Sequence, residues 1–208
     1  METMGSLYKQ HSSAKGYSQV YARHVAMLLE GLDHEAVADI IGLFAVAHDQ
    51  KKRIYFIGNG GSAATCGHFV NDLHAGSLRH GGGGFRVQDL AGNVASLTAL
   101  ANDVGFEHVF SKQLEGVLDA GDIVVAISAS GNSRNLVAAV EYARTQSAVT
   151  IGFLGFDGGT LAPLCDHSVI VSTEKGEYGP VEDVHMVLDH LISSYFCFNR
   201  NAARNGGV

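Results

Sequence analysis

The chain has 208 residues, of which 46% are apolar and 17% are charged. These values are typical of one compact domain with a well-buried core, so we expect residues 1–208 to form a single domain. The net charge of −7 argues against a general nucleic-acid-binding surface. No apolar run approaches the roughly 20 residues of a membrane span, so the sequence predicts neither a nucleic-acid nor a membrane partner.

The compartment is predicted from the N-terminus and the cysteines. The segment from Met1 to Gly16 is polar and lacks the apolar core of a signal peptide. Cys66, Cys165 and Cys197 are odd in number and have no metal-type spacing, which predicts reduced, mostly buried thiols. Together these features predict a cytoplasmic protein.

Helices and strands follow one another in a regular order. Apolar residues at helical spacing predict two helices over about 17–31 and 34–50, which we expect to form an N-terminal helical hairpin. Strands are then predicted at about 53–57, 85–88, 122–127, 149–154 and 167–171, with helices between them and a last helix over about 180–198. This alternation predicts a three-layer α/β fold, with a parallel five-stranded sheet in a core over residues 53–198.

Two other segments are predicted to lack regular structure. Residues 201–208 are expected to be a flexible tail. The glycine-rich run from His80 to Gly84 is either a loop over the site or a plain exposed connection.

Polar loops follow two of the predicted strands and precede helices. One is Gly58 to Ser62, and the other is Ser128 to Ser133. Helix N-termini attract anions, and in open parallel sheets ligands bind at the carboxyl ends of strands. The hydroxyls of Ser128, Ser130 and Ser133 would add donors for a phosphate. The alternative is that Asn132 or Ser133 is simply a helix N-cap.

Other side chains suggest acid–base or metal chemistry. His68 and Asp72 are four residues apart and share a helix face, while Glu182 and His190 lie on the last helix. Such a set can bind a divalent metal such as zinc or can move protons, and the spacing leaves both roles open. Asn102 and Asp103 either line the crevice or are ordinary turn residues.

Five segments resemble the SIS (sugar isomerase) domain family, and within it the bacterial phosphoheptose isomerases. The resemblance covers nearly the whole chain and rests on Ile57–Ser62, His68-Phe69, Ala101–Phe106, Ser128–Ser133 and Asp183-Val184-His185. It implies the flavodoxin-like five-stranded SIS fold and a homotetramer with sites at subunit interfaces. It also implies conversion of sedoheptulose 7-phosphate to glycero-manno-heptose 7-phosphate.

The resemblance also implies roles for particular residues. Zinc would bind His68, Asp72, Glu182 and His190, of which Asp72, Glu182 and His190 would also be catalytic. The phosphosugar would bind Asn59, Gly60, Ser62, Asn102, Asp103, Ser128, Ala129, Ser130 and Ser133.

Two of these positions depart from the family pattern. Asp72 stands where the family has glutamate, and Glu182 where it has glutamine. Because a shift of about 1 Å can cost on the order of 100-fold in rate, we expect the two changes to compensate. Glu182 would then be a metal ligand or the replacement base.

Three functions are compatible with these patterns. The leading hypothesis is an aldose–ketose isomerase that works by proton transfer through an enediol. A non-catalytic relative that binds the bacterial replication initiator is the second, although the retained histidines and carboxylates argue against it. The third is a sugar-phosphate sensor, which would bind the ligand without turnover.

Overall fold

The computed structural model describes residues 3–76, 78 and 84–204. Its helices and strands are, in chain order, α1 (Met4–Gln10), α2 (Ala14–Glu30), α3 (His34–Asp49), β1 (Arg53–Gly58), α4 (Gly61–Asn71), the π-helix η1 (Asp72–Gly76), β2 (Arg86–Asp89), α6 (Val94–Asp103), the 3-10 helix η2 (Phe106–His108), α7 (Val109–Leu114), β3 (Ile123–Ser128), α8 (Arg134–Thr145), β4 (Val149–Gly155), β5 (His167–Val171) and α9 (Tyr178–Arg204).

The five strands form one parallel sheet in the order β2-β1-β3-β4-β5, which confirms the predicted fold class. The chain moves outward from β1 to β2 on one side and to β3, β4 and β5 on the other. The strand order therefore reverses between β1 and β3, and in open α/β sheets ligands bind at this point.

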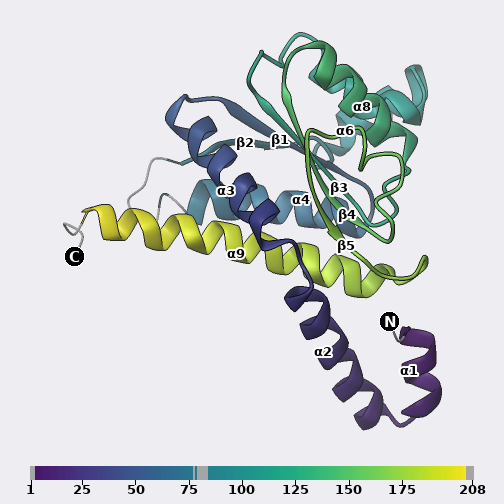
Figure 1. The fold of residues 1–208 in the computed structure, drawn as a ribbon. Helices are drawn as coiled ribbons and strands as arrows, with labels where there is room; N and C mark the ends of the chain where they lie inside the picture. The colour runs from purple at the N-terminus through teal and green to yellow at the C-terminus, as the bar shows by residue number, and fades with distance from the viewer. Residues whose placement is uncertain (1–2, 77, 79–83, 205–208) are drawn as a thin grey trace.

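Helices cover both faces of the sheet (Figure 1). Side chains of α3, α4 and α9 pack on one face, and those of α7 and α8 pack on the other. Strand β1 serves both layers, because Ile54 and Phe56 point to the first face while Tyr55 and Ile57 point to the second. The strands read as continuous apolar runs because both of their faces are buried.

The predicted helical hairpin does not form, although both of its helices exist. Figure 1 shows α2 running away from the sheet, with α1 beside it, while α3 lies against the sheet. Helix α2 is attached to α9, because the Tyr21 hydroxyl donates a hydrogen bond to Asp183 Oδ2 at 2.6 Å. Burial, together with the Asp183 carboxylate, raises the pKa of Tyr21 above its usual value.

The last helix is longer than predicted. Helix α9 runs from Tyr178 to Arg204, so residues 201–204 of the expected flexible tail are helical. Residues 205–208, like residues 80–83 of the glycine-rich run, lie outside the described part of the chain. Within the described residues, no helix is both long enough and apolar enough to cross a membrane.

Candidate active site

The two predicted polar loops meet at the carboxyl ends of β1 and β3. Asn59 follows β1, and its side-chain amide exchanges two hydrogen bonds of 2.9 Å each with the amide of Asn135. Asn135 lies in the first turn of α8 and is 2% exposed. Sequence analysis missed this residue, although a polar side chain next to the apolar residues of α8 is the signal for it. The paired amides fix one loop against the other.

Between these loops lies a pocket of about 210 Å³. Its lining comprises Asn59, Ser62, Ile127, Ser128, Ala129, Ser130, Ser133, Leu136, Tyr178 and Glu182. Most of the predicted phosphate-binding residues are thus brought together. Gly60 is not in the lining but is the N-cap of α4, with a positive φ of 55°. Asn102 and Asp103 are exposed at the end of α6, where the Asn102 amide donates to Asp103.

Three helices begin at this pocket. Asn59 and Ser62 belong to the start of α4, Ser133 to the start of α8, and Tyr178 to the start of α9. Each start carries partial positive charge and unpaired N–H groups. Ser133 is the N-cap of α8 by position, but its side chain makes no cap hydrogen bond within the described structure. Its hydroxyl is therefore available to a ligand, as an anion site requires.

The loop from Ser128 to Ser133, the serine loop, has a backbone conformation at one position that only glycine readily adopts. Gly131 has a φ of 63°, and a Cβ atom there would overlap the carbonyl of Gly158. The loop is held by its own side chains, since Ser128 Oγ accepts a hydrogen bond from the Gly131 N–H at 3.0 Å. The hydroxyls of this loop can still donate their protons to a bound anion.

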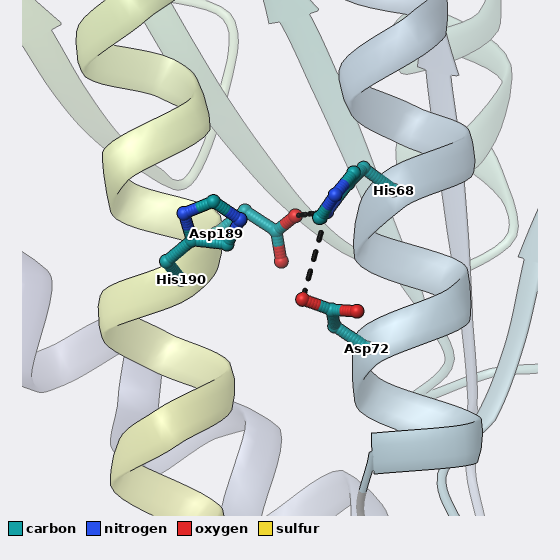
Figure 2. Close-up of side chains that lie close together, drawn as sticks. All are labelled: His68, Asp72, Asp189 and His190. Atoms are coloured by element: carbon teal, nitrogen blue, oxygen red, sulfur yellow. Dashed lines mark hydrogen bonds and ion pairs between the residues drawn. The ribbon is translucent and has the colours of Figure 1, made fainter.

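A second group of polar side chains lies farther along α9 and at the end of α4, where η1 begins (Figure 2). Among the described residues, His68, Asp72, Asp189 and His190 offer ligand atoms that all lie within 4.8 Å of one another. His68 Nδ1 is 2.7 Å from Asp189 Oδ2 and 3.5 Å from Asp72 Oδ2. The rings of His68 and His190 lie edge to face, with centroids 5.0 Å apart. Three of the four predicted metal ligands are therefore close together.

Glu182, the fourth predicted ligand, is not in this cluster within the chain. It precedes Asp189 by seven residues, which is about 10 Å along a helix axis. Its carboxylate instead lies against the start of α4, where a Cβ atom on Gly61 would overlap it. Burial, and then the charge of Asp183, raise the pKa of Glu182. Glu182 thus belongs to the pocket of the serine loop.

Asp189 takes the fourth place in the cluster, and sequence analysis did not single it out. Its side chain is 0% exposed, and Oδ1 has no hydrogen-bond partner among the described residues. Burial and the neighbouring Asp72 raise the pKa of Asp189, against the effect of His68. A buried carboxylate oxygen without a partner is costly, and a bound cation would satisfy it.

The cluster fits a zinc ion in its chemistry. Imidazole nitrogens and carboxylate oxygens bind zinc at about 2.0–2.2 Å, so two ligand atoms of one ion lie at most about 4 Å apart. The observed spread of 4.8 Å needs only small side-chain rotations to meet that limit. The unpaired oxygen of Asp189 and this donor set both fit a divalent metal.

Comparison with known proteins places the chain in a family. The family model for the SIS domain matches residues 20–155. The chain belongs to the SIS domain family. A protein of Nitratiruptor named phosphoheptose isomerase is 35% identical over 161 residues, which cover 77% of this chain and 83% of the relative. A phosphoheptose isomerase of Geobacter metallireducens is 34% identical over 168 residues, covering 79% of this chain and 87% of the relative.

Solved structures of SIS domain proteins have the same architecture. The phosphoheptose isomerase of Neisseria gonorrhoeae superposes with a TM-score of 0.75 at 28% identity. The superposition covers 91% of this chain and 98% of the other. The similarity thus extends well beyond residues 20–155, to both N-terminal and C-terminal parts of the fold.

The Asp183-Val184-His185 motif, which contributed to the SIS resemblance, is structural in this chain. Asp183 accepts the hydrogen bond of Tyr21, as described above. His185 is fully buried, and its Nε2–H donates to the Leu154 carbonyl of β4 at 3.2 Å. Burial lowers the pKa of His185 to about 4. This motif attaches α9 to α2 and to the sheet, and it does not line the site.

The buried His185 predicts a specific loss of stability in acid. In the unfolded chain its pKa is about 6.5, so the unfolded state binds the proton more readily than the folded state. Above about pH 6.5 His185 is neutral in both the folded and the unfolded chain, so it does not change the free energy of unfolding. As the pH drops from about 6.5 toward 4, only the unfolded chain binds the proton, and stability falls. We expect a loss on the order of 3 kcal/mol over this window, measured by urea unfolding at several pH values. In His185→Gln, which can still donate to Leu154, this part of the pH dependence should disappear; an unchanged profile would contradict the assignment.

Proposed function

We propose that this chain is a phosphoheptose isomerase, which interconverts sedoheptulose 7-phosphate and D-glycero-D-manno-heptose 7-phosphate. One observation carries the proposal: an anion pocket and a His/carboxylate cluster lie along the same packed pair of helices, α4 and α9. The relatives named phosphoheptose isomerase support it. The reaction is an aldose–ketose isomerisation of a phosphosugar.

The spacing of the two groups suits a long substrate. Glu182 lines the pocket and Asp189 lies in the cluster, and they are about 10 Å apart along α9. A heptose 7-phosphate carries its phosphate at one end and its reacting carbonyl at the other. With the phosphate held by Ser130 and Ser133, the carbonyl end would reach toward His68 and Asp72.

The proton transfers are assigned to the exposed side of the cluster. Asp72, whose side chain is 27% exposed, would take the proton from C1 of the ketose. The C2 carbonyl oxygen would receive a proton from His190, which gives the enediol. The C1 hydroxyl would then lose its proton to the base form of His190, and Asp72 would return its proton to C2. Protons balance over this cycle, and no other reactant is required.

Glu182 has a separate part in this proposal. It lies beside the phosphate pocket, too far along α9 to reach the same carbon as Asp72. The carboxyl group, with its raised pKa, would hydrogen-bond a hydroxyl of the sugar chain. Its role is thus to orient the substrate between the phosphate and the reacting carbons.

A divalent metal, with zinc as the first candidate, is part of the proposal. His68, Asp72 and His190 would hold it, with His190 binding through one ring nitrogen while its other nitrogen exchanges the proton with the substrate oxygen. Such an ion would polarise the substrate carbonyl and so favour loss of the adjacent proton. Asp72 can be both a metal ligand and the base that takes the C1 proton, because a carboxylate has two oxygens with separate lone pairs.

A homotetramer with sites between subunits is also proposed. Helix α9 exposes Leu191, Tyr195 and Phe198 at helical spacing, and such a stripe is typical of a surface that another chain covers. We further propose the cytoplasm as the compartment, because Cys66 and Cys165 are described as thiols.

The direct test is isomerisation of sedoheptulose 7-phosphate by the purified chain. We expect formation of the aldose phosphate, loss of turnover after chelation, and its return with added zinc. Uptake of solvent deuterium at C1 or C2, followed by NMR, reports the proton transfer itself. Unphosphorylated sedoheptulose is the control and should react far more slowly. A folded protein that binds the phosphosugar without deuterium uptake would instead be a sensor, and one that does not bind it would favour the adaptor function.

A further inference from the structure

Tyr178 is a large, exposed side chain at the pocket between the two polar loops. Much of the lining of this pocket is small and polar, and its apolar members Ile127 and Leu136 are fully buried. Tyr178, in contrast, is 52% exposed. It precedes Glu182 on α9 by one helical turn, so the two side chains share a helix face, and both line the pocket. The ring of Tyr178 therefore lies between the pocket and the solvent.

The ring of Tyr178 is supported by Phe156. The two ring centroids are 5.2 Å apart and the ring planes meet at 78°, which is a favourable edge-to-face arrangement. Phe156 follows β4 directly and is 6% exposed, and its φ of 55° is unusual for so bulky a residue. Such a residue keeps this conformation only where the surrounding structure holds it. Phe156 is thus a rigid support for the exposed ring.

The backbone next to Tyr178 is also held in place. Glu177, the residue before it, accepts a hydrogen bond from the backbone N–H of Met4 in α1 through Oε1. Its Oε2 lies 3.5 Å from Nε2 of the buried His24 in α2. The start of α9 is therefore attached to both N-terminal helices, which gives Tyr178 a defined position beside the pocket. A side chain positioned in advance loses little conformational freedom when a ligand binds.

The hydroxyl of Tyr178 has no hydrogen-bond partner within the described part of the chain. A tyrosine combines an apolar ring with a polar tip, and its O–H can donate to a charged oxygen. We propose that Tyr178 is a specificity-determining residue of this pocket, whose hydroxyl donates a hydrogen bond to the substrate's phosphate and whose ring packs on the carbon chain next to it. The inference rests on the phosphate pocket of the proposed function and adds a residue of α9 to it.

The ring and the hydroxyl would act on different parts of the ligand. The hydroxyl would contribute to the binding of any phosphate, inorganic phosphate included. The ring would contribute only where the phosphate carries a carbon chain. Hydroxyls such as those of Ser130 and Ser133 contact phosphate oxygens alone, so they do not distinguish a phosphosugar from the free ion. Tyr178 would supply that distinction.

The test compares Tyr178→Phe and Tyr178→Ala with a matched control, Tyr8→Phe. Tyr8 is 54% exposed on α1, and its ring packs edge to face on Tyr17 with centroids 5.5 Å apart. Its setting is thus close to that of Tyr178, but it does not line the pocket. Binding of sedoheptulose 7-phosphate and of inorganic phosphate is measured by equilibrium dialysis with a total-phosphorus assay. Interconversion of ketose and aldose does not change this total, so turnover does not disturb the measurement.

The two variants should differ in a specific way. Tyr178→Phe is expected to weaken the binding of both ligands by about tenfold, through loss of one hydrogen bond to a charged group. Tyr178→Ala should weaken inorganic phosphate by the same factor and sedoheptulose 7-phosphate by about fourfold more, the value of one buried CH₂ group. Tyr8→Phe should stay within about twofold of the parent for both ligands.

Two further readouts separate a ligand contact from a structural role. In Tyr178→Phe the KM for sedoheptulose 7-phosphate should rise while kcat stays nearly the same, because the phosphate is held equally in the ground state and the transition state. The melting temperature of Tyr178→Phe should equal that of the parent, because the hydroxyl that is removed has no partner in the described structure.

The outcomes are distinct. If Tyr178→Phe binds both ligands as tightly as the parent, the inference is overturned and the proposed function is untouched. A loss in Tyr8→Phe as large as in Tyr178→Phe, or a lower melting temperature of Tyr178→Phe, would overturn it as well. If the parent binds neither ligand, the phosphate pocket fails and the inference fails with it. Because binding is the readout, a parent that binds the phosphosugar without turnover would contradict the proposed function alone.

Discussion

Replacing Asp72 by asparagine is expected to lower kcat for sedoheptulose 7-phosphate by about 10²–10⁴-fold, the usual contribution of a general base. Asparagine has nearly the same size as aspartate but cannot accept the proton from C1. KM should change much less, because the phosphate is held about two turns away, at the serine loop. The measurement is steady-state kinetics, with the zinc content of each variant determined in parallel.

Two controls decide whether the carboxylate itself matters. Asp72→Glu keeps the acid but moves it by one methylene, so its activity should fall between those of the parent and Asp72→Asn. Asp49→Asn removes a carboxylate whose side chain is 82% exposed on α3 and should have no effect. If Asp72→Asn keeps its rate while Glu182→Gln loses it, the base lies on α9, and the proton-transfer assignment is wrong.

The pocket between the two polar loops was predictable from sequence because it depends on local patterns. Buried parallel strands are apolar runs, and the residues that follow them must lie at one edge of the sheet. Gly58 and Ser128 end adjacent strands, so their loops had to meet. The pairing of Asn59 with Asn135 was not predictable, because it depends on how α8 is oriented over the sheet.

The membership of the His/carboxylate cluster was only partly predictable from sequence, and the reason is geometric. Glu182 and His190 are eight residues apart, which is about 12 Å along the axis and well over two turns. The resemblance to the family implies this pair beside His68 and Asp72, whereas within one chain only His190 lies in the cluster. A carboxylate at a buried position of an amphipathic helix was the available signal for Asp189.

The position of the N-terminal helices could not be read from periodicity. Apolar spacing predicts both α2 and α3, and the structure shows Asp33 capping α3 by accepting the Ala36 N–H. The direction in which α2 leaves depends on the backbone of two or three turn residues and on distant contacts such as Tyr21 with Asp183. Neither leaves a pattern in the sequence of the helices themselves.

Replacing Ser133 by aspartate is expected to lower kcat/KM for the phosphosugar by at least about 100-fold. Ser133 lines the pocket at the N-cap of α8, so a carboxylate there would face the bound phosphate. Two unit charges 4 Å apart near a protein surface repel by about 4 kcal/mol, which corresponds to nearly 10³ in affinity. Most of the loss should appear in KM, because the reacting carbons lie at the other end of the substrate.

The control for this variant keeps the helix cap and removes the charge. Asparagine and aspartate are both strong N-caps, so Ser133→Asn and Ser133→Asp should melt at or above the temperature of the parent. Ser133→Asn is expected to lose about tenfold or less, since its amide can still donate a hydrogen bond to phosphate. Inorganic phosphate should inhibit the parent and Ser133→Asn but not Ser133→Asp. Equal losses in both variants would mean that shape rather than charge governs the pocket, and the phosphate assignment would then have to move away from the serine loop.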